Sequence, residues 1–490
     1  MKCDENKPFC WRCVKAGRLC GGYSHETALQ FAIRDGIQTD KNTNRLAHLA
    51  FHVLSLDING QPLQRSAIWG YSFLQLCNSV SCVRAAAAAF GAAYEASLQD
   101  SHTDALTTWK YYGQAVQQLR SHVADETASP ESLAIASITL ACAESLSQHE
   151  QNALVHLQGA SQVLDNVNKK ALPHTNPETL AAVTQELSNI GILIASHVIS
   201  EVPSFLQFEP QKASCVSNEV EQATKSAFSA LQNAYRFVGV AAPRRYVHPS
   251  WVDLDTDLCR YRDEILAELR SAVSALQTLS AHLQTESPTP AMKLTEAETI
   301  ADVYALRCQL TLPLIFISSI HSAYETSYDR FQCLFQEIVR DAAASIRLQH
   351  RFKTGVFSRF SARPGILSPL FFAAMKCRNK SLRTVAIDLM RGLGRQGPAD
   401  GHTMAAIAMR LAEIETPGIE QTGDTHDACD VLEEQRVHGY SFQTPPSYEL
   451  GRQVLQIEFS KPDPPLSQGW GQVDYSKGEN WKFWTESLFV

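Results

Sequence analysis

From about residue 70 onward, apolar residues recur every three or four positions, which is the period of an α-helix with one buried face. The clearest repeat lies within 256–283. Its apolar positions are Leu258, Tyr261, Ile265, Leu269, Ala272, Leu276, Leu279 and Leu283. This repeat is what a helix that packs one face on a hydrophobic core requires. A self-associating helix pair stays an alternative, although the repeat covers fewer than four heptads.

The first half of this region predicts several packed helices. Residues 80–98 are rich in alanine, with small residues on every face, which favours a helix in close contact with its neighbours. Ser129-Pro130-Glu131 supplies an N-cap, a first-turn proline and an acid for another helix. The predicted apolar faces of three helices are Leu106, Trp109, Tyr112, Val116, Leu119 and Val123; Ile135, Ile138, Cys142 and Leu146; and Leu154, Leu157, Ala160 and Leu164.

The C-terminal part predicts helices followed by strands. Residues 366–394 read as two apolar helices broken at Asn379-Lys380-Ser381, a hairpin with a basic outer turn, and 404–415 read as one more helix. RVHGYSF and QVLQIEF predict two short strands. The closing WKFWTESLFV favours a strap packed on the domain over an activation segment. The fold class is therefore all-α, with packed helical hairpins and a minor C-terminal β-hairpin.

Length and composition place this helical region in an ordinary globular protein. At 490 residues the chain needs more than one packed region or one large helical array. Its 44% hydrophobic and 19% charged residues are typical of globular proteins. No apolar run reaches the roughly 18 residues that span a bilayer, and the charged start leaves no room for a signal peptide. We expect a soluble intracellular protein without a membrane partner.

Candidate metal chemistry is concentrated at the start of the chain. Four of the thirteen cysteines are Cys3, Cys10, Cys13 and Cys20, spaced C-x6-C-x2-C-x6-C. Four thiolates of this kind suit tetrahedral zinc. A disulfide framework fits poorly in a long chain with an odd cysteine count. A reduced or redox-active CxxC with two chance neighbours remains the alternative.

The same stretch is locally basic. Lys2, Lys7, Arg12, Lys15 and Arg18 are opposed there by two acids only, whereas the whole chain carries a net charge of −8. Contact with DNA phosphates is therefore expected at this end. A solvated basic terminus is the plainer alternative.

KCDENKPFCWRCVKAGRLCGGY resembles the second half of the fungal Zn(II)2Cys6 cluster of C6 zinc-cluster transcription factors. On that resemblance Cys3 matches the third family cysteine, Pro8 the loop proline, and Cys10, Cys13 and Cys20 the last three. The resemblance implies zinc as cofactor, a CGG-like DNA element and transcription co-regulators as partners, and a nuclear regulator of RNA polymerase II genes.

The helical region is similar to the regulatory region of the same family, in which YxxAxxxLR is followed by HLxGAxxLL. The matching residues are Tyr112, Ala115, Leu119 and Arg120; His156, Leu157, Gly159, Ala160 and Leu164; and, further on, Pro369, Leu370, Phe371, Cys377, Arg378, Leu382, Arg383, Ala386 and Leu389. The resemblance implies a partial zinc motif at 1–23, a linker at 24–65, a regulatory domain at 66–460 that could take a small-molecule effector, and a tail at 461–490.

The family's first two cysteines and its base-reading helix would precede Met1. We expect that translation starts upstream of Met1. The alternative is a chain that has lost sequence-specific DNA binding and acts as an interaction or metabolite-sensing regulatory protein.

Other chemistry finds little support in the sequence. Asp253, Asp255, Asp257 and Glu264 have calcium-loop spacing, but Leu258 stands where the loop requires glycine. His149 and His156 read as ordinary surface or core residues, and Cys377 as a buried thiol. The chain shows none of the common nucleotide-binding, hydrolase or metalloprotease motifs, so an enzyme is not expected.

Overall fold

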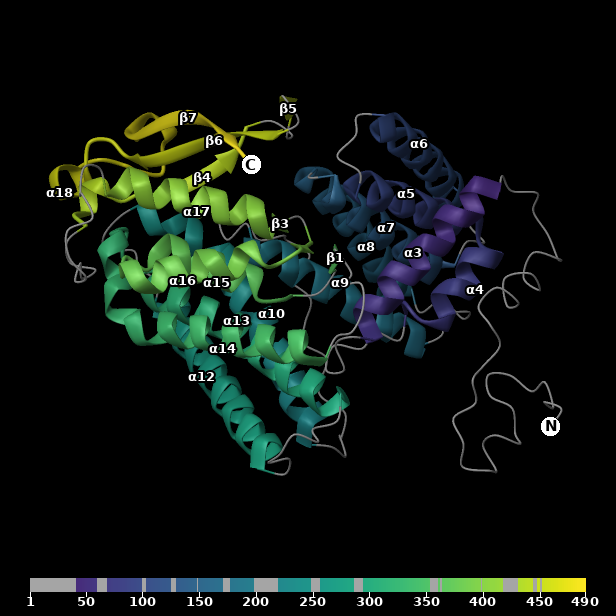
Figure 1. The fold of residues 1–490 in the computed structure, drawn as a ribbon, viewed down its shortest axis with the longest axis horizontal. Coiled ribbons are helices and arrows are strands. Elements are labelled where there is room, and N and C mark those ends of the chain that lie inside the picture. The colour runs from purple at the N-terminus through teal and green to yellow at the C-terminus, as the bar shows by residue number, and fades with distance from the viewer. Residues whose placement is uncertain are drawn as a thin grey trace.

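The protein is represented by a computed structural model that describes residues 41–59, 68–98, 103–124, 129–147, 149–170, 177–197, 219–247, 256–285, 294–352, 360–361, 364–397, 399–416, 431–443, 447–449 and 452–490. Figure 1 shows two helical lobes, with α9 (Pro177–His197) between them and a β-sheet on the outer side of the C-terminal lobe. This confirms the predicted all-α fold with a minor β part.

The N-terminal lobe is built around α5, which packs against α3, α6 and α7. The helices of this lobe are α3 (Lys41–Asn59), α4 (Tyr71–Ser79), α5 (Ser81–Leu98), α6 (Thr103–Val123), α7 (Pro130–Leu146) and α8 (Glu150–Lys170). The predicted close packing of the alanine-rich helix is confirmed, because a Cβ added at Gly91 of α5 would collide with the backbone oxygen of Leu46 in α3.

Part of the linker expected over 24–65 is helical. Helix α3 occupies Lys41–Asn59 and buries Leu46, Ala50 and Leu54 against the lobe. These three residues are four positions apart and share one face of the helix. The polar and histidine residues between them make the helical periodicity of apolar residues hard to detect in the sequence. Packing against α5 therefore stabilises a helix in a stretch for which the sequence predicted a linker.

Helix α6 is rotated from the predicted orientation. Leu106, Trp109 and Val123 of the expected apolar face are 78%, 53% and 62% exposed, whereas Tyr111 and Ala115 are buried. Tyr112, Val116 and Leu119 are only partly buried. The Tyr111–Ala115 side of α6 enters the core because the small side chains of α5 leave room for a bulky aromatic ring.

Helices α7 and α8 confirm their predicted faces. The Ser129 side chain accepts a hydrogen bond from the Ser132 amide at 3.4 Å, and Pro130 occupies the first turn, as a helix start requires. All four predicted residues of α7 are buried, and in α8 Leu157, Ala160 and Leu164 are fully buried.

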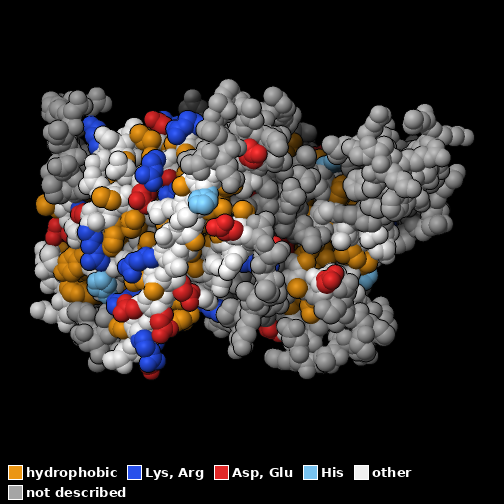
Figure 2. All heavy atoms as spheres, turned by 90° about the horizontal axis from the view of Figure 1, so that it is seen from below, with side chains coloured by type: hydrophobic (Ala, Val, Ile, Leu, Met, Phe, Trp, Pro, Cys, Tyr) orange, Lys and Arg blue, Asp and Glu red, His pale blue; other side chains and the backbone are white. Residues whose placement is uncertain are grey.

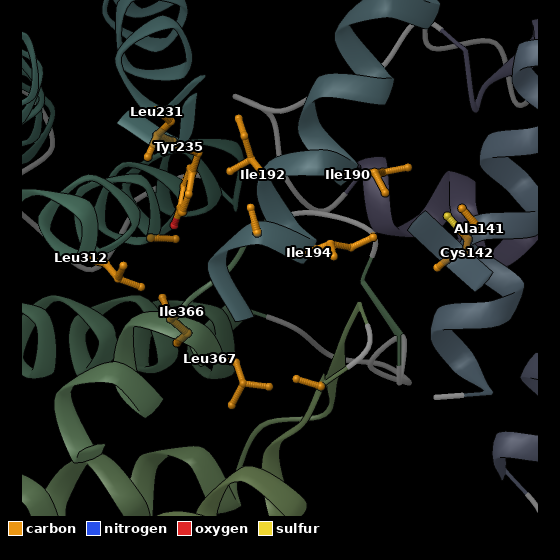
Figure 3. Packing of buried hydrophobic residues seen from close by; sticks show 14 of the residues in the cluster. Ala141, Cys142, Ile190, Ile192, Ile194, Leu231, Tyr235, Leu312, Ile366 and Leu367 are labelled. Atoms are coloured by element: carbon orange, nitrogen blue, oxygen red, sulfur yellow. The ribbon is translucent and has the colours of Figure 1, made fainter. Parts of the chain in front are cut away.

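Helix α9 joins the two lobes. Figure 3 shows Ile190 on the side of α9 that faces Cys142 of α7, and Ile192 on the side that faces Tyr235 of α10 (Glu219–Ala241). Ser196 of α9 accepts a hydrogen bond of 2.9 Å from the hydroxyl of Ser368 in α15 (Leu367–Lys376). The hydrophobic core therefore continues through this joint into both lobes.

The C-terminal lobe contains longer helices. Besides α10 and α15, they are η3 (Ala242–Tyr246), α12 (Thr256–Thr285), α13 (Leu294–Ser319), η4 (Glu325–Phe331), α14 (Gln332–Phe352), α16 (Lys380–Arg391) and α17 (Gly401–Glu415). The stripe predicted on α12 is buried from Ile265 to Leu279, while Tyr261 near its start is 37% exposed. The periodicity of the sequence thus predicted the core face of the central turns.

Helix α13 is long and apolar enough to cross a membrane by length and composition. Its most apolar window is 94% buried inside the protein, which is what a core helix shows. The bent pair α4 and α5 passes the same test when the two helices are joined.

The hairpin predicted at 366–394 is present as α15 and α16. Asn379 caps α16 by accepting a hydrogen bond from the Leu382 amide at 3.0 Å. The expectation of a basic outer turn is wrong for Arg378 and Arg383, which are 4% and 5% exposed. Both guanidinium groups point into the lobe, where they contact the buried carboxylate of Glu415. Lys380, at the start of α16, is exposed.

The strands form two sheets. The first contains β1 (Phe360–Ser361), β2 (Arg395–Gln396) and β3 (Ala399–Asp400); the second contains β4 (Gly439–Phe442), β5 (Ser447–Glu449), β6 (Arg452–Pro462) and β7 (Trp481–Phe489). The two predicted strands are β4 and β6, paired antiparallel with Tyr440 opposite Phe459. The predicted strap is β7, which pairs antiparallel with β6.

Candidate functional site

The predicted zinc and phosphate-contact residues all lie outside the described residues. They are Cys3, Cys10, Cys13 and Cys20 for zinc, and Lys2, Lys7, Arg12, Lys15 and Arg18 for phosphate. Over residues 41–490 with their gaps, no group of three or more His, Cys, Asp or Glu side chains is arranged to hold a metal ion. Of the calcium-like acids, Asp257 lies in the first turn of α12, while Asp253 and Asp255 fall outside the described part.

The surface of the C-terminal lobe is mixed in charge. On the face seen from below, basic and acidic side chains are interspersed, with hydrophobic ones between them (Figure 2). A nucleic-acid interface usually gathers basic residues into one patch or stripe. The described side chains of this face do not form such a patch.

Cys377 is buried between α15 and α16, as expected. Burial raises the pKa of its thiol, so the thiolate needed for nucleophilic attack is disfavoured.

A polar cluster in the N-terminal lobe joins the two family-like motifs. The Tyr112 hydroxyl lies 2.9 Å from His156 Nε2, and His149 Nδ1 lies 2.9 Å from the Glu144 carboxylate. Burial lowers the pKa of His156. Burial alone would raise the pKa of Glu144, but hydrogen bonds from His149 and Tyr112 lower it overall. These contacts tie α6, α7 and α8 together.

The C-terminal lobe contains a second and larger group of charges, here named the buried charge cluster. Its members are Arg245, Glu325, Lys376, Arg378, Arg383 and Glu415, each less than 10% exposed. Glu325 Oε2 lies 2.8 Å from Lys376 Nζ and 3.3 Å from Arg378 Nη2. Arg378 also reaches Glu415 at 2.8 Å, and Arg383 reaches the other oxygen of Glu415 at 2.6 Å.

The members of this cluster come from helix ends that meet inside the lobe. Glu325 begins η4, Lys376 ends α15 and Glu415 ends α17. Burial would raise the pKa of the Glu325 carboxyl, but the charges of Lys376 and Arg378 hold it well below its usual range. Against the same effect of burial, Arg378 and Arg383 lower the pKa of Glu415 to about 2. Both carboxylates are therefore ionised at neutral pH.

A chain of polar contacts extends from this cluster towards the sheet. Glu433 of η6 (Glu433–Gln435) accepts hydrogen bonds of 2.8 Å from the amides of Glu325 and Thr326. His438 Nε2 lies 3.2 Å from Glu433, and His438 Nδ1 lies 3.1 Å from the Tyr246 hydroxyl. Burial lowers the pKa of His438, so the ring is neutral at pH 7. The neutral ring can then donate from Nε2 to Glu433 and accept at Nδ1 from Tyr246.

A pocket of about 260 Å³ lies where this chain of contacts reaches the surface. Its lining comes from η6, the ends of β6 and β7, and the turn before α18 (Leu466–Gly469). The lining residues are Glu433, Glu434, Arg436, His438, Lys461, Pro462, Asp463, Pro465, Leu466 and Lys482. Arg436 is fixed by two contacts of 2.7 and 2.8 Å to Asp329.

Sequence reasoning missed this pocket and most of the buried charge cluster. Their residues are dispersed from Arg245 to Lys482 and have no shared spacing. The Cys377-Arg378 pair was noted only as part of a family-like hairpin. One local signal is the histidine at 438 within the predicted strand RVHGYSF, but it does not identify a partner.

Residues 54–198 match the family model described as the fungal specific transcription factor domain. The match runs from the end of α3 to the end of α9 and includes Tyr112 and His156. No curated protein and no solved structure matches the chain significantly.

This match supports a role of the chain in regulating transcription. It covers less than a third of the chain, which corresponds to most of the N-terminal lobe and α9. The cysteine-rich stretch 1–23 and the pocket of the C-terminal lobe both lie outside the matched range.

Proposed function

We propose that this protein is a zinc-dependent, sequence-specific DNA-binding regulator of RNA polymerase II genes. The observation that carries the proposal is the match of residues 54–198 to the fungal specific transcription factor domain. The N-terminal cysteine spacing supports the finer statement, because it has the ligand type and number that zinc takes in structural sites.

In this proposal Cys3, Cys10, Cys13 and Cys20 hold zinc, which would fix the fold of the short N-terminal motif. Lys2, Lys7, Arg12, Lys15 and Arg18 contact DNA phosphates and so position the protein without reading bases. The helical lobes act as the regulatory domain and contact transcription co-regulators or a small effector.

A second candidate is an all-α interaction or metabolite-sensing regulatory protein without sequence-specific DNA binding. It is favoured by the pocket of the C-terminal lobe, which has room for a small molecule.

Zinc content and DNA preference separate the two candidates. Zinc per chain is measured on the purified 490-residue protein, together with binding to CGG-containing and scrambled duplexes at two salt concentrations. The matched variant is Cys10→Ser, with Cys333→Ser as a control, since Cys333 is an exposed cysteine of α14.

The first candidate predicts bound zinc and binding to DNA phosphates, both lost in Cys10→Ser and kept in Cys333→Ser. A preference for the CGG duplex is expected only when the upstream base-reading helix is included. The second predicts negligible zinc and weak binding that falls with salt equally for both duplexes. A preference for CGG without zinc would contradict both.

A further inference from the structure

We propose that the pocket beside η6, β6 and β7 binds a small zwitterion of the free α-amino acid class. The proposal rests on the proposed function only in treating this ligand as the effector of the regulator. The pocket is lined by residues of η6, of the adjacent ends of β6 and β7, and of the start of α18. Figure 1 shows α18 and these strands on the outer side of the C-terminal lobe.

Two lysines line one wall of the pocket. Lys461 of β6 and Lys482 of β7 are directly opposite each other in the antiparallel register. Like charges in that position destabilise a sheet. Lys461 Nζ donates one hydrogen bond of 3.1 Å, to the backbone oxygen of Glu434, and Lys482 has no side-chain partner among the residues that the structure describes. A carboxylate bound between the two ammonium groups would relieve their repulsion.

A carboxylate of the protein lies on the turn that follows β6. Asp463 lines the pocket, and its side-chain oxygens have no partner within the described part of the chain. Glu434 also lines the pocket, and one of its carboxylate oxygens accepts a hydrogen bond of 2.7 Å from Ser467. These two acids offer acceptors for an ammonium group beside the lysine pair.

The charge balance of the lining selects the ligand class. Arg436 and Glu433 are committed to Asp329 and to the amides of η4, respectively. His438 is held by Glu433 and Tyr246. The charged side chains of the lining that are left to face a ligand are therefore two lysines and two acids, Lys461, Lys482, Glu434 and Asp463, whose formal charges cancel. A dianion would meet two carboxylates with no compensating charge of its own, whereas a zwitterion pairs with both signs.

The apolar lining residues and the volume of the pocket limit the size and the side chain of the ligand. Pro462, Pro465 and Leu466 give the pocket an apolar part next to the charged one. Its volume of about 260 Å³ admits a molecule of amino-acid size. We infer that amino acids with a small or medium apolar side chain bind best.

The pocket also adjoins the buried charge cluster. Glu433, which lines the pocket, holds the first amides of η4, and Glu325 at that position belongs to the cluster. A bound ligand would therefore brace η6 against η4 and the end of the sheet.

Isothermal titration calorimetry on the full chain tests the proposal. The probes are L-alanine, L-valine, succinate and inorganic phosphate, each titrated at millimolar concentration in the absence of DNA. The variants are Lys482→Gln and Asp463→Asn. The control is Lys477→Gln, which removes an exposed lysine that is not among the lining residues. Among the described residues its charged contact is with Asp474, at 3.9 Å.

We expect saturable binding of L-valine or L-alanine that weakens about tenfold or more in Lys482→Gln and Asp463→Asn and stays unchanged in Lys477→Gln. Succinate or phosphate binding as tightly as the amino acids would overturn the ligand class. Absence of amino-acid binding, or binding insensitive to both variants, would overturn the site. Neither result depends on zinc content or DNA preference, so this test and that of the proposed function can fail separately.

Discussion

The two lobes use their interiors differently. The N-terminal lobe buries small apolar residues on α5 and α7, and its polar cluster around Glu144 ties neighbouring helices. The C-terminal lobe joins its charges into the buried charge cluster, in which the carboxylates of Glu325 and Glu415 are shared by four cations. Removing part of an apolar side chain costs free energy in proportion to the contacts that are lost. Removing a buried carboxylate also leaves its cationic partners buried without a counter-charge. We therefore expect the C-terminal lobe to tolerate single polar substitutions much less well.

The largest effect is expected for Glu325→Gln. This change leaves Lys376, Arg378 and Arg245 buried without their shared carboxylate, and should lower the free energy of unfolding by about 3–5 kcal/mol. Urea denaturation followed by circular dichroism measures it.

The matched control is Glu95→Gln, which removes the partner of Arg45 in a pair that is 53% and 32% exposed. Its expected cost is about 0–1 kcal/mol. Equal losses in the two variants would remove the contrast between the lobes.

A second test concerns the close packing of the N-terminal lobe. Gly91→Ala should cost about 1–3 kcal/mol, because the new methyl group collides with the backbone of α3. Gly113→Ala in α6 meets no atom within 4 Å and should stabilise the protein by about 0.5–1 kcal/mol. Opposite signs in thermal unfolding support the described packing, and a stabilising Gly91→Ala would contradict it.

Acidification should weaken both lobes through buried neutral histidines. Burial lowers the pKa of His156 and of His438, whereas both take up a proton near pH 6.5 in the unfolded chain. The unfolded state then binds more protons, so stability falls as the pH drops below about 6.5, by at most about 1.4 kcal/mol per pH unit for each group.

The pH effect is measured by urea denaturation between pH 7.5 and 5.5. His156→Gln should reduce this pH dependence. An identical pH dependence in His156→Gln and the unaltered protein would show that His156 is not held neutral.

The smallest effect is expected at the joint between the lobes. Ser368→Ala removes the hydrogen bond to Ser196 of α9, together with a longer one of 3.3 Å from Gln309 of α13, and should cost about 1 kcal/mol. Hydrogen exchange should increase at the end of α9 and the start of α15. The control is Ser121→Ala, at an exposed position of α6. Equal hydrogen exchange in the two variants would argue against a role of the Ser368–Ser196 hydrogen bond in joining the lobes.

Local patterns predicted the elements well where burial follows helical periodicity. The apolar stripe of α12 and the N-cap at Ser129 could both be predicted from the sequence, because residues close to each other in the chain determine them. The face of α6 was not readable, because α5 decides which side enters the core. The charge cluster could not be predicted either, since Glu325 and Arg378 are 53 residues apart in the chain and meet only in the folded lobe. The predicted zinc ligands lie outside the described residues and stay a prediction.

A tethering experiment tests the central claim, that the chain regulates transcription, most directly. The 490-residue chain is fused to an unrelated DNA-binding domain, and transcription is measured from a fungal reporter promoter that carries the matching site. We predict a change in reporter transcription relative to the DNA-binding domain alone, in either direction, that is lost in Glu325→Gln. Reporter transcription equal to that of the DNA-binding domain alone, with the fusion present in the nucleus at normal level, would contradict the account.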